Sequence, residues 1–193
     1  MAERTMLRRL LDRFRRPRRV LITSQERITR TEDVKRLVSE LDLSATVTYT
    51  ELAARLSRLR GRPIVIKPYP ESLVAESRRI DEPLPHGVWT PRASADYVFY
   101  RQDTTPSHQR RIILHELGHI CCRHVDEQAE PAGIDDGPPC PAEIARAVQR
   151  AGCFAADQEQ AAETFAYLIE RRTRPNLSAT GDTQADRYRL LED

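Results

Sequence analysis

Apolar residues recur every three or four positions in six segments of the chain, a spacing typical of helices that bury one face. The segment after Thr48 is the best delimited, because Thr48 and Glu51 form a capping box and Gly61 stands where a helix commonly ends. A threonine followed by Pro106 likewise marks the start of a long helix that includes Ile120. The pattern predicts helices at residues 6–14, 31–43, 49–60, 106–120, 141–150 and 157–172.

Three short runs that are rich in β-branched or aromatic residues predict strands. They lie at residues 63–69, 87–90 and 97–100, and a turn-like stretch at 91–96 separates the last two. Two strands joined by so short a turn pair in the antiparallel direction. We therefore expect an α+β fold with a small, mainly antiparallel sheet packed against the helices.

The composition indicates a folded chain without a membrane segment. The chain has 193 residues, of which 39% are hydrophobic and 31% charged. Its apolar stretches fall short of the roughly 18 residues that suggest a membrane span, and one domain of ordinary size is expected. The net charge of +2 hides a division, because residues 1–30 hold ten Arg and three acidic residues (10 − 3 = +7), which leaves −5 for the rest.

The charge division and the periodicity predict three parts. Residues 1–30 form a basic N-terminal appendage, residues 31–172 the folded domain, and residues 173–193 a polar C-terminal tail. Within the domain, residues 126–141 hold four prolines, two glycines and five acidic residues, which predicts an exposed acidic loop insertion. Because arginines interrupt the apolar residues at the start, the first part does not match a secretory signal peptide, and we expect a cytoplasmic protein.

Two features that often indicate function carry little weight here. Residues 1–20 are rich in arginine but lack the interleaved aromatic side chains that stack on bases, and the rest of the chain is acidic. We therefore do not expect nucleic-acid binding as the main function. The four cysteines form no Cys-x-x-Cys pair, so we expect inert free thiols. They are Cys121, Cys122, Cys140 and Cys153.

The strongest chemical signal is a His-Glu-x-x-His sequence that begins at His115 and ends at His119. On a helix the two histidines are one turn apart, so both imidazoles leave the same face and can bind one metal ion. Glu116 is displaced sideways, where its carboxylate can reach a water molecule on the metal without binding the metal itself. Gly118 precedes the second histidine, and so small a residue allows another segment to approach closely.

A catalytic zinc ion takes three protein ligands, so a third must come from elsewhere in the chain. The candidates are His108, His124, the acids of the 126–141 insertion, and the pair Glu159 and Glu163. His124 follows the first ligand histidine by nine residues, which is about 900° of helical rotation, so it points away if the helix continues. Glu159 and Glu163 are one turn apart, so one carboxylate can bind metal while the other hydrogen-bonds a ligand imidazole.

The motif and its surroundings resemble the ImmA/IrrE family of zinc metallopeptidases. The similarity covers about residues 50–170 and includes the His-Glu-Leu-Gly-His sequence. It also includes a later helix whose core, residues 159–166, matches the family's Glu-x-x-Ala-x-x-Phe-Ala pattern. Where the family usually has Asn or Asp, this chain has Glu163.

The resemblance implies a zincin-like fold, one zinc ion and a peptidase mechanism with a general base. The implied ligands are His115, His119 and Glu159, and the implied base is Glu116. The implied activity is that of a metallo-endopeptidase that cleaves a regulatory protein, such as a helix-turn-helix repressor or an antitoxin. The alternative is a regulatory or toxin-type partner protein whose zinc site is structural or vestigial.

The strand predicted just before the motif helix offers a place for such a substrate. If its edge is free, an extended peptide can add to the sheet there. From the pattern alone, an ordinary core strand is an equal interpretation. The residues concerned are Tyr97, Val98, Phe99 and Tyr100.

Overall fold

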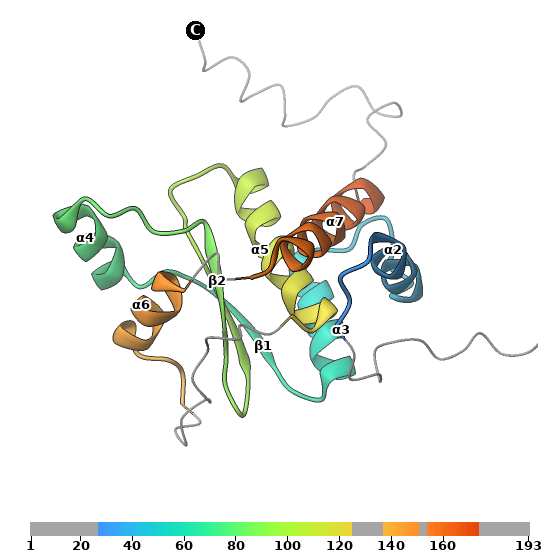
Figure 1. The fold of residues 1–193 in the computed structure, drawn as a ribbon, viewed down its shortest axis with the longest axis horizontal. Helices are drawn as coiled ribbons and strands as arrows, with labels where there is room; N and C mark the ends of the chain where they lie inside the picture. The colour runs from blue at the N-terminus through green and yellow to red at the C-terminus, as the bar shows by residue number, and fades with distance from the viewer. Residues whose placement is uncertain (1–26, 125–136, 151–153, 174–193) are drawn as a thin grey trace, which may run out of the picture.

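The computed structural model describes residues 27–124, 137–150 and 154–173, which form six helices and a three-stranded sheet. The helices are α2 (Thr31–Glu40), α3 (Tyr49–Arg60), α4 (Glu71–Ile80), α5 (Pro106–Cys122), α6 (Pro141–Gln149) and α7 (Ala156–Thr173). The strands are β1 (Ile64–Pro68), β2 (Gly87–Pro91) and β3 (Asp96–Tyr100). The α+β prediction is confirmed. The sheet lies between α2, α3, α5 and α7 on one face and α4 and α6 on the other (Figure 1).

Five of the six predicted helices are confirmed as α2, α3, α5, α6 and α7. The sixth, at residues 6–14, lies outside the described residues, as do the rest of residues 1–26, residues 125–136 of the insertion and residues 174–193 of the tail. At the start of α3, the Thr48 hydroxyl accepts a hydrogen bond from the Glu51 amide at 3.2 Å, as the capping box predicted.

Helix α4 has no counterpart among the predicted elements. None of its residues is buried, and Pro70 at its start offers no side-chain hydrogen bond. Its half-buried Leu73 and Val74 pack against the cluster around the sheet. A short helix without a fully buried stripe or a polar cap leaves little trace in the sequence pattern.

The sheet is mixed, so the prediction of a mainly antiparallel sheet is wrong. The strand order is β1-β3-β2. Strands β2 and β3 are antiparallel, as the short turn predicted, whereas β1 runs parallel to β3 with Ile64 opposite Asp96. A parallel pair needs a long crossover, and here the chain passes through α4 and β2 between the two strands.

The strand order also settles the two interpretations of the strand before the motif helix. Strand β3 is the central strand and is paired along both edges, so the free-edge prediction is wrong and the core-strand interpretation is confirmed. Val98 faces the helices α2, α3, α5 and α7, where it joins residues such as Leu117 and Phe165. Its neighbours Tyr97 and Phe99 face the opposite side, toward α6.

A buried carboxylate ties the sheet to α3 and to the end of α5. Asp96 is 0% exposed and accepts hydrogen bonds from Arg60 Nε at 3.0 Å, Arg62 Nε at 3.0 Å and Trp89 Nε1 at 2.9 Å. Arg60 also donates to the carbonyl of Ile120 at 3.0 Å. A buried carboxylate needs such partners. Since Arg60 binds both Asp96 and Ile120, this network also holds the last turn of α5, where the second motif histidine lies.

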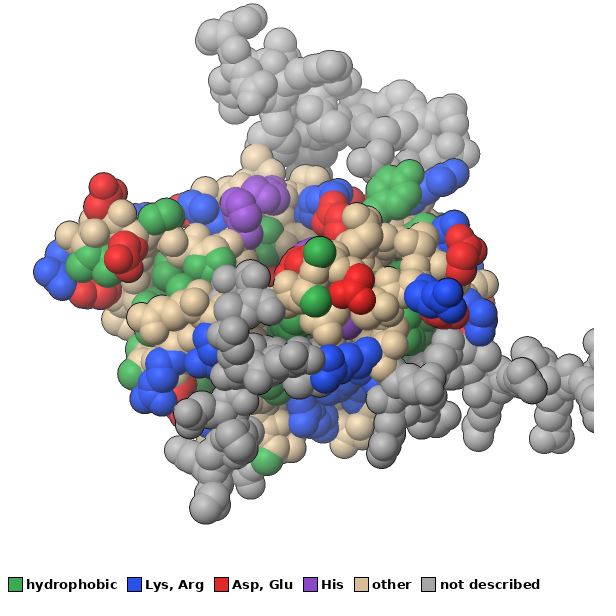
Figure 2. Space-filling view, in the orientation of Figure 1, with side chains coloured by type: hydrophobic (Ala, Val, Ile, Leu, Met, Phe, Trp, Pro, Cys, Tyr) green, Lys and Arg blue, Asp and Glu red, His purple; other side chains and the backbone are tan. Residues whose placement is uncertain are grey.

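The surface of the described domain carries mixed charge. Basic and acidic side chains are interspersed on the face seen in Figure 2, in contrast to the arginine-rich first segment of the sequence. No described helix combines the length and the apolar character that crossing a bilayer requires. Three cysteines are free thiols, as predicted, and the fourth lies outside the described residues. Burial raises the pKa of the Cys122 thiol to about 12, so it is protonated at neutral pH.

Candidate metal centre

Helix α5 brings the two motif histidines together, as the spacing predicted. The helix begins after Thr105, whose hydroxyl accepts a hydrogen bond from the His108 amide, and Pro106 occupies its first turn. One turn separates His115 from His119, and their Nε2 atoms lie 3.0 Å apart. Two imidazole nitrogens therefore face the same point in space.

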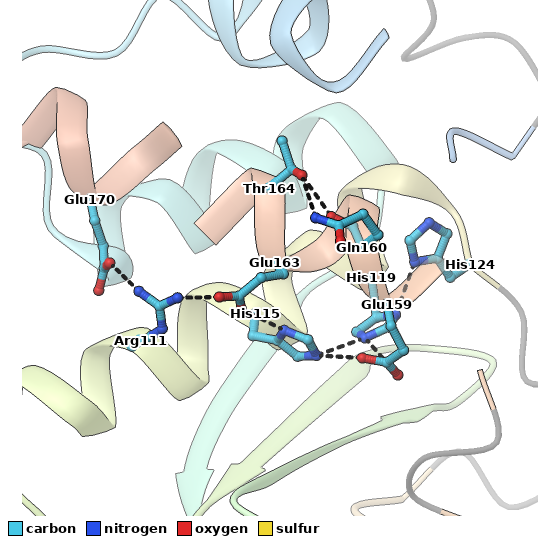
Figure 3. A network of polar contacts seen from close by, with 9 residues as sticks. All are labelled: Arg111, His115, His119, His124, Glu159, Gln160, Glu163, Thr164 and Glu170. Carbon is cyan, nitrogen blue, oxygen red and sulfur yellow. Dashed lines mark hydrogen bonds and ion pairs between the residues drawn. The ribbon is translucent and has the colours of Figure 1, made fainter. Parts of the chain in front are cut away.

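Helix α7 supplies the third donor group. Glu159 Oε2 lies 3.2 Å from His115 Nε2, and Glu159 Oε1 lies 3.7 Å from His119 Nε2. The three residues form a group whose ligand atoms all lie within 4.8 Å of one another (Figure 3). A tetrahedral zinc ion with bonds of 2.0–2.1 Å places its donor atoms about 3.4 Å apart. The nitrogen and oxygen donors therefore fit a metal ion of this kind in number, type and spacing.

The small residue before the second histidine lets the two helices meet. A Cβ atom added at Gly118 would lie 2.9 Å from the carbonyl oxygen and 3.0 Å from the Cα atom of Ala162 on α7. Ala161 and Ala166 on α7 are also fully buried. The close approach predicted from Gly118 is confirmed, and it brings Glu159 within reach of the histidines.

Glu116 lies beside the three donors and is held by strand β2. Its side chain is buried, and the backbone amide of Trp89 donates a hydrogen bond to its carboxylate. A Cβ atom at Gly87 would lie 2.9 Å from Glu116 Oε1, so glycine leaves the space that the carboxylate fills. Burial raises the pKa of Glu116 to about 7, although His115 acts in the opposite direction. A carboxyl group with this pKa can accept and return a proton near neutral pH.

One flank of the centre, which we call the buried flank, consists of the buried His119 and His124 and the half-buried Phe154, and carries no acidic or basic side chain other than the two imidazoles. His119 is 1% exposed, and its ring stacks on Phe154 with centroids 4.0 Å apart. His119 Nδ1 lies 2.9 Å from His124 Nδ1. Burial, with the neighbouring His115 and His124, lowers the pKa of His119 to about 2. A neutral imidazole is the form that binds a metal.

His124 reaches this position because α5 does not continue. The helix ends at Cys122, Arg123 adopts a left-handed conformation with φ of 58°, and the chain turns back. His124 therefore does not point away from the motif, but it contacts the outer nitrogen of His119 and is not one of the three donors. Its own Nε2 lies 2.9 Å from the carbonyl oxygen of Ile28.

The opposite flank, formed by His115, Glu163 and Arg111, is charged; we call it the charged flank. Glu163 Oε2 lies 3.7 Å from His115 Nδ1, close enough for an ion pair but too far for the hydrogen bond expected between this carboxylate and a ligand imidazole. Arg111 forms an ion pair with Glu163 and a second one with Glu170 at 2.9 Å (Figure 3). Burial alone would lower the pKa of His115, but the surrounding carboxylates outweigh it and raise that pKa.

The other candidates for a third ligand lie elsewhere. His108 Nδ1 pairs with the Thr104 hydroxyl at 2.8 Å, and its ring contacts His86 with centroids 5.0 Å apart. All five acids of the insertion lie outside the described residues. The sequence pattern did not indicate the roles of four further residues at the centre, because they act through contacts that form in the folded chain: Ile28, Gly87, Arg111 and Phe154. Only the i, i+4 spacing of Arg111 to His115 was visible in the sequence.

Comparison with known proteins adds no relative: no family model, curated protein or solved structure matches the chain. The fold and the site therefore define a class only in general terms. The chain is an α+β protein in which two helices bring two imidazoles and a carboxylate to one point. A further buried carboxyl group lies next to them.

Proposed function

We propose that the chain is a zinc-dependent metallo-endopeptidase of the ImmA/IrrE type, with His115, His119 and Glu159 as zinc ligands and Glu116 as general base. One observation carries the proposal: three donor groups meet among the described residues while a separate carboxyl group is buried beside them and bound by β2. Catalytic zinc sites use three protein ligands, whereas structural sites usually use four. Three donors and a nearby base therefore favour catalysis.

In this mechanism each residue has a distinct task. A zinc ion held by the three donors would supply a Lewis acid for the scissile carbonyl and would lower the pKa of the attacking water toward about 7. Glu116 accepts the proton of the attacking water and passes it to the leaving amine. The amide of Trp89 orients the Glu116 carboxylate for this transfer.

The strand beside Glu116 offers a binding place for an extended substrate. Strand β2 pairs with β3 on one side, and it lies at the edge of the three-stranded sheet of the described residues. Trp89 on this strand donates to Glu116, so a peptide that adds along β2 passes the proposed base. This replaces the central strand β3 as the proposed substrate edge.

The proposed substrate is a protein, in keeping with the family resemblance, and a helix-turn-helix repressor or an antitoxin is the first class to test. The main experiment compares the zinc-loaded wild type with Glu116→Gln. The probes are a peptide library from a digested proteome and purified helix-turn-helix repressors, with new termini identified by mass spectrometry. The wild type should cleave, and Glu116→Gln should bind one zinc ion but lose cleavage by about 100-fold or more.

The matched control is Glu32→Gln, which changes an exposed carboxylate on α2 in the same way. It should cleave like the wild type. Cleavage retained by Glu116→Gln would remove the base from the proposal. One zinc ion per chain without turnover of any probe by the wild type would favour the regulatory or toxin-type partner protein instead.

A further inference from the structure

The imidazole of His119 contacts His124, which in turn contacts the backbone of Ile28; we call these three groups the His119–His124–Ile28 network. Its Nδ1 atom lies 2.9 Å from Nδ1 of His124, and Nε2 of His124 lies 2.9 Å from the carbonyl oxygen of Ile28. Both histidines are 1% exposed. This network therefore connects a proposed metal ligand to a backbone carbonyl 91 positions earlier in the sequence (119 − 28 = 91).

The carbonyl of Ile28 determines which ring nitrogens of His119 and His124 carry protons. A carbonyl oxygen can only accept a hydrogen bond, so Nε2 of His124 carries a proton. Charging a buried imidazole is costly, so His124 is neutral and its Nδ1 atom is an acceptor. His119 must then donate from Nδ1. A neutral His119 with a proton on Nδ1 has a free lone pair on Nε2, the atom that faces His115 and Glu159.

Backbone hydrogen bonds and buried packing hold the His119–His124–Ile28 network in place. Ile28 is 3% exposed, and its amide donates to the carbonyl of Cys122 at 2.9 Å. The amide of His124 donates to the carbonyl of His119 at 3.0 Å across the left-handed turn at Arg123. Phe154 stacks on the His119 ring and limits its rotation. Backbone contacts on both sides therefore hold His124 in the position needed to accept from His119.

We propose that His124 is a positioning residue that holds His119 in the Nδ1-protonated tautomer and so reserves Nε2 of His119 for the metal. The proposal rests on the metal centre of the proposed function, but it concerns a residue outside the ligand set. Isolated neutral imidazoles favour the opposite tautomer, whose Nε2 proton would block the metal. Outer partners of this type commonly change metal affinity by about 10–100-fold.

The first test needs no variant. The full chain, freed of metal with a chelator and labelled with ¹⁵N at histidine, is examined by NMR through the couplings between ring nitrogens and carbon-bound protons. The expected result is a protonated Nδ1 and an unprotonated Nε2 for His119, and the reverse for His124. A proton on Nε2 of His119 in the folded, metal-free chain would overturn the proposal.

The second test separates the contact with His119 from the contact with Ile28. In His124→Asn the side-chain oxygen replaces Nδ1 and still accepts from His119, whereas in His124→Gln the amide nitrogen replaces Nε2 and retains only the bond to Ile28. His124→Leu retains neither bond. Zinc affinity is measured by competition with a chromophoric chelator, and Co²⁺ absorption reports the geometry of the centre.

His124→Leu and His124→Gln should lose about 10–100-fold in zinc affinity, and His124→Asn should lose much less. A purely structural role would make Gln at least as good as Asn, since Gln preserves the link to the backbone. Equal zinc affinity in all four proteins would overturn the inference and leave the metal centre intact. A wild type that binds no zinc would instead overturn the proposed function, while the tautomer of His119 would still be measurable.

Discussion

Two imidazoles from one turn of α5 are held by opposite physical means. On the buried flank, the His119 side chain is 2% exposed and rests between another imidazole and an aromatic ring. On the charged flank, the His115 side chain is 25% exposed and lies between Glu159 and Glu163. Equivalent positions in the motif therefore have unlike surroundings, and burial is the property that separates them.

The difference has a chemical consequence. The pKa of His119 is lowered to about 2, so this residue is neutral in the metal-free protein throughout the physiological range. The pKa of His115 is raised by its carboxylate neighbours, so this residue takes up a proton more readily. A metal ion entering the centre would therefore compete with protons at His115 more than at His119.

The largest effects are expected when each ligand is removed in turn. His119→Ala and His115→Ala should each weaken zinc binding by at least about 100-fold, because each donor supplies several kcal/mol of the binding free energy. The two variants should differ in stability without metal. His119→Ala should lose about 2–4 kcal/mol in free energy of unfolding, since it opens a cavity and leaves Nδ1 of the buried His124 without its partner. His115→Ala should stay within about 1 kcal/mol of the wild type.

Urea unfolding in the presence of a chelator measures the stabilities, and chelator competition measures the zinc affinities. Equal loss of stability in both variants would show that the buried flank is packed no more tightly than the charged one. That outcome would remove the physical basis of the comparison.

A smaller effect, common to both flanks, is expected for Gly118→Ala. The new methyl group would meet the backbone of Ala162, which cannot rotate away as a side chain can. We expect a loss of about 1–3 kcal/mol in stability from overpacking, reduced by the roughly 1 kcal/mol helix preference of Ala over Gly. Displacing α7 should also weaken zinc binding about tenfold.

Ser107→Ala, an exposed position on the same helix, is the control for Gly118→Ala and should leave the zinc affinity unchanged. Unfolding midpoints and zinc competition give both quantities. Wild-type zinc affinity in Gly118→Ala would mean that the close contact between α5 and α7 does not set the position of Glu159.

The smallest effect concerns pH and tests the charged flank alone. Zinc binds the neutral imidazole, so affinity should fall as the pH is lowered through the pKa of His115, which is raised above 6.5. His119 should contribute no proton competition in this range. Glu163→Gln removes one of the carboxylates that raise the pKa of His115, so the fall should begin at lower pH.

Zinc affinity measured between pH 6 and pH 8 checks this prediction, with Glu32→Gln as the control that should match the wild type. In Glu116→Gln, which removes the neighbouring carboxyl group whose pKa is about 7, the slope should correspond to about one proton from the two ligand histidines. A slope of two protons would indicate that His119 is also protonated, and the buried flank would then not be neutral.

Much of the local structure could be predicted from the sequence. The capping box of α3, the start of α5 and the close approach at Gly118 all depend on residues near one another in the chain or on the size of one residue. Strand order was not predictable in this way. The sequence of β3 is compatible with an edge strand and with a central strand, because the residues of one strand do not specify which strands pair with it.

The sequence by itself determined the two imidazoles of the centre, since helical periodicity places His115 and His119 on one face. It also supplied Glu159 through a family resemblance, and the folded chain brings that carboxylate to the histidines. The tertiary structure alone decided what surrounds them. Ile28 and Phe154 reach His119 through contacts between distant segments, and such contacts form only when the core assembles. Burial lowers the pKa of His119 and keeps its imidazole neutral, whereas the neighbouring carboxylates raise the pKa of His115.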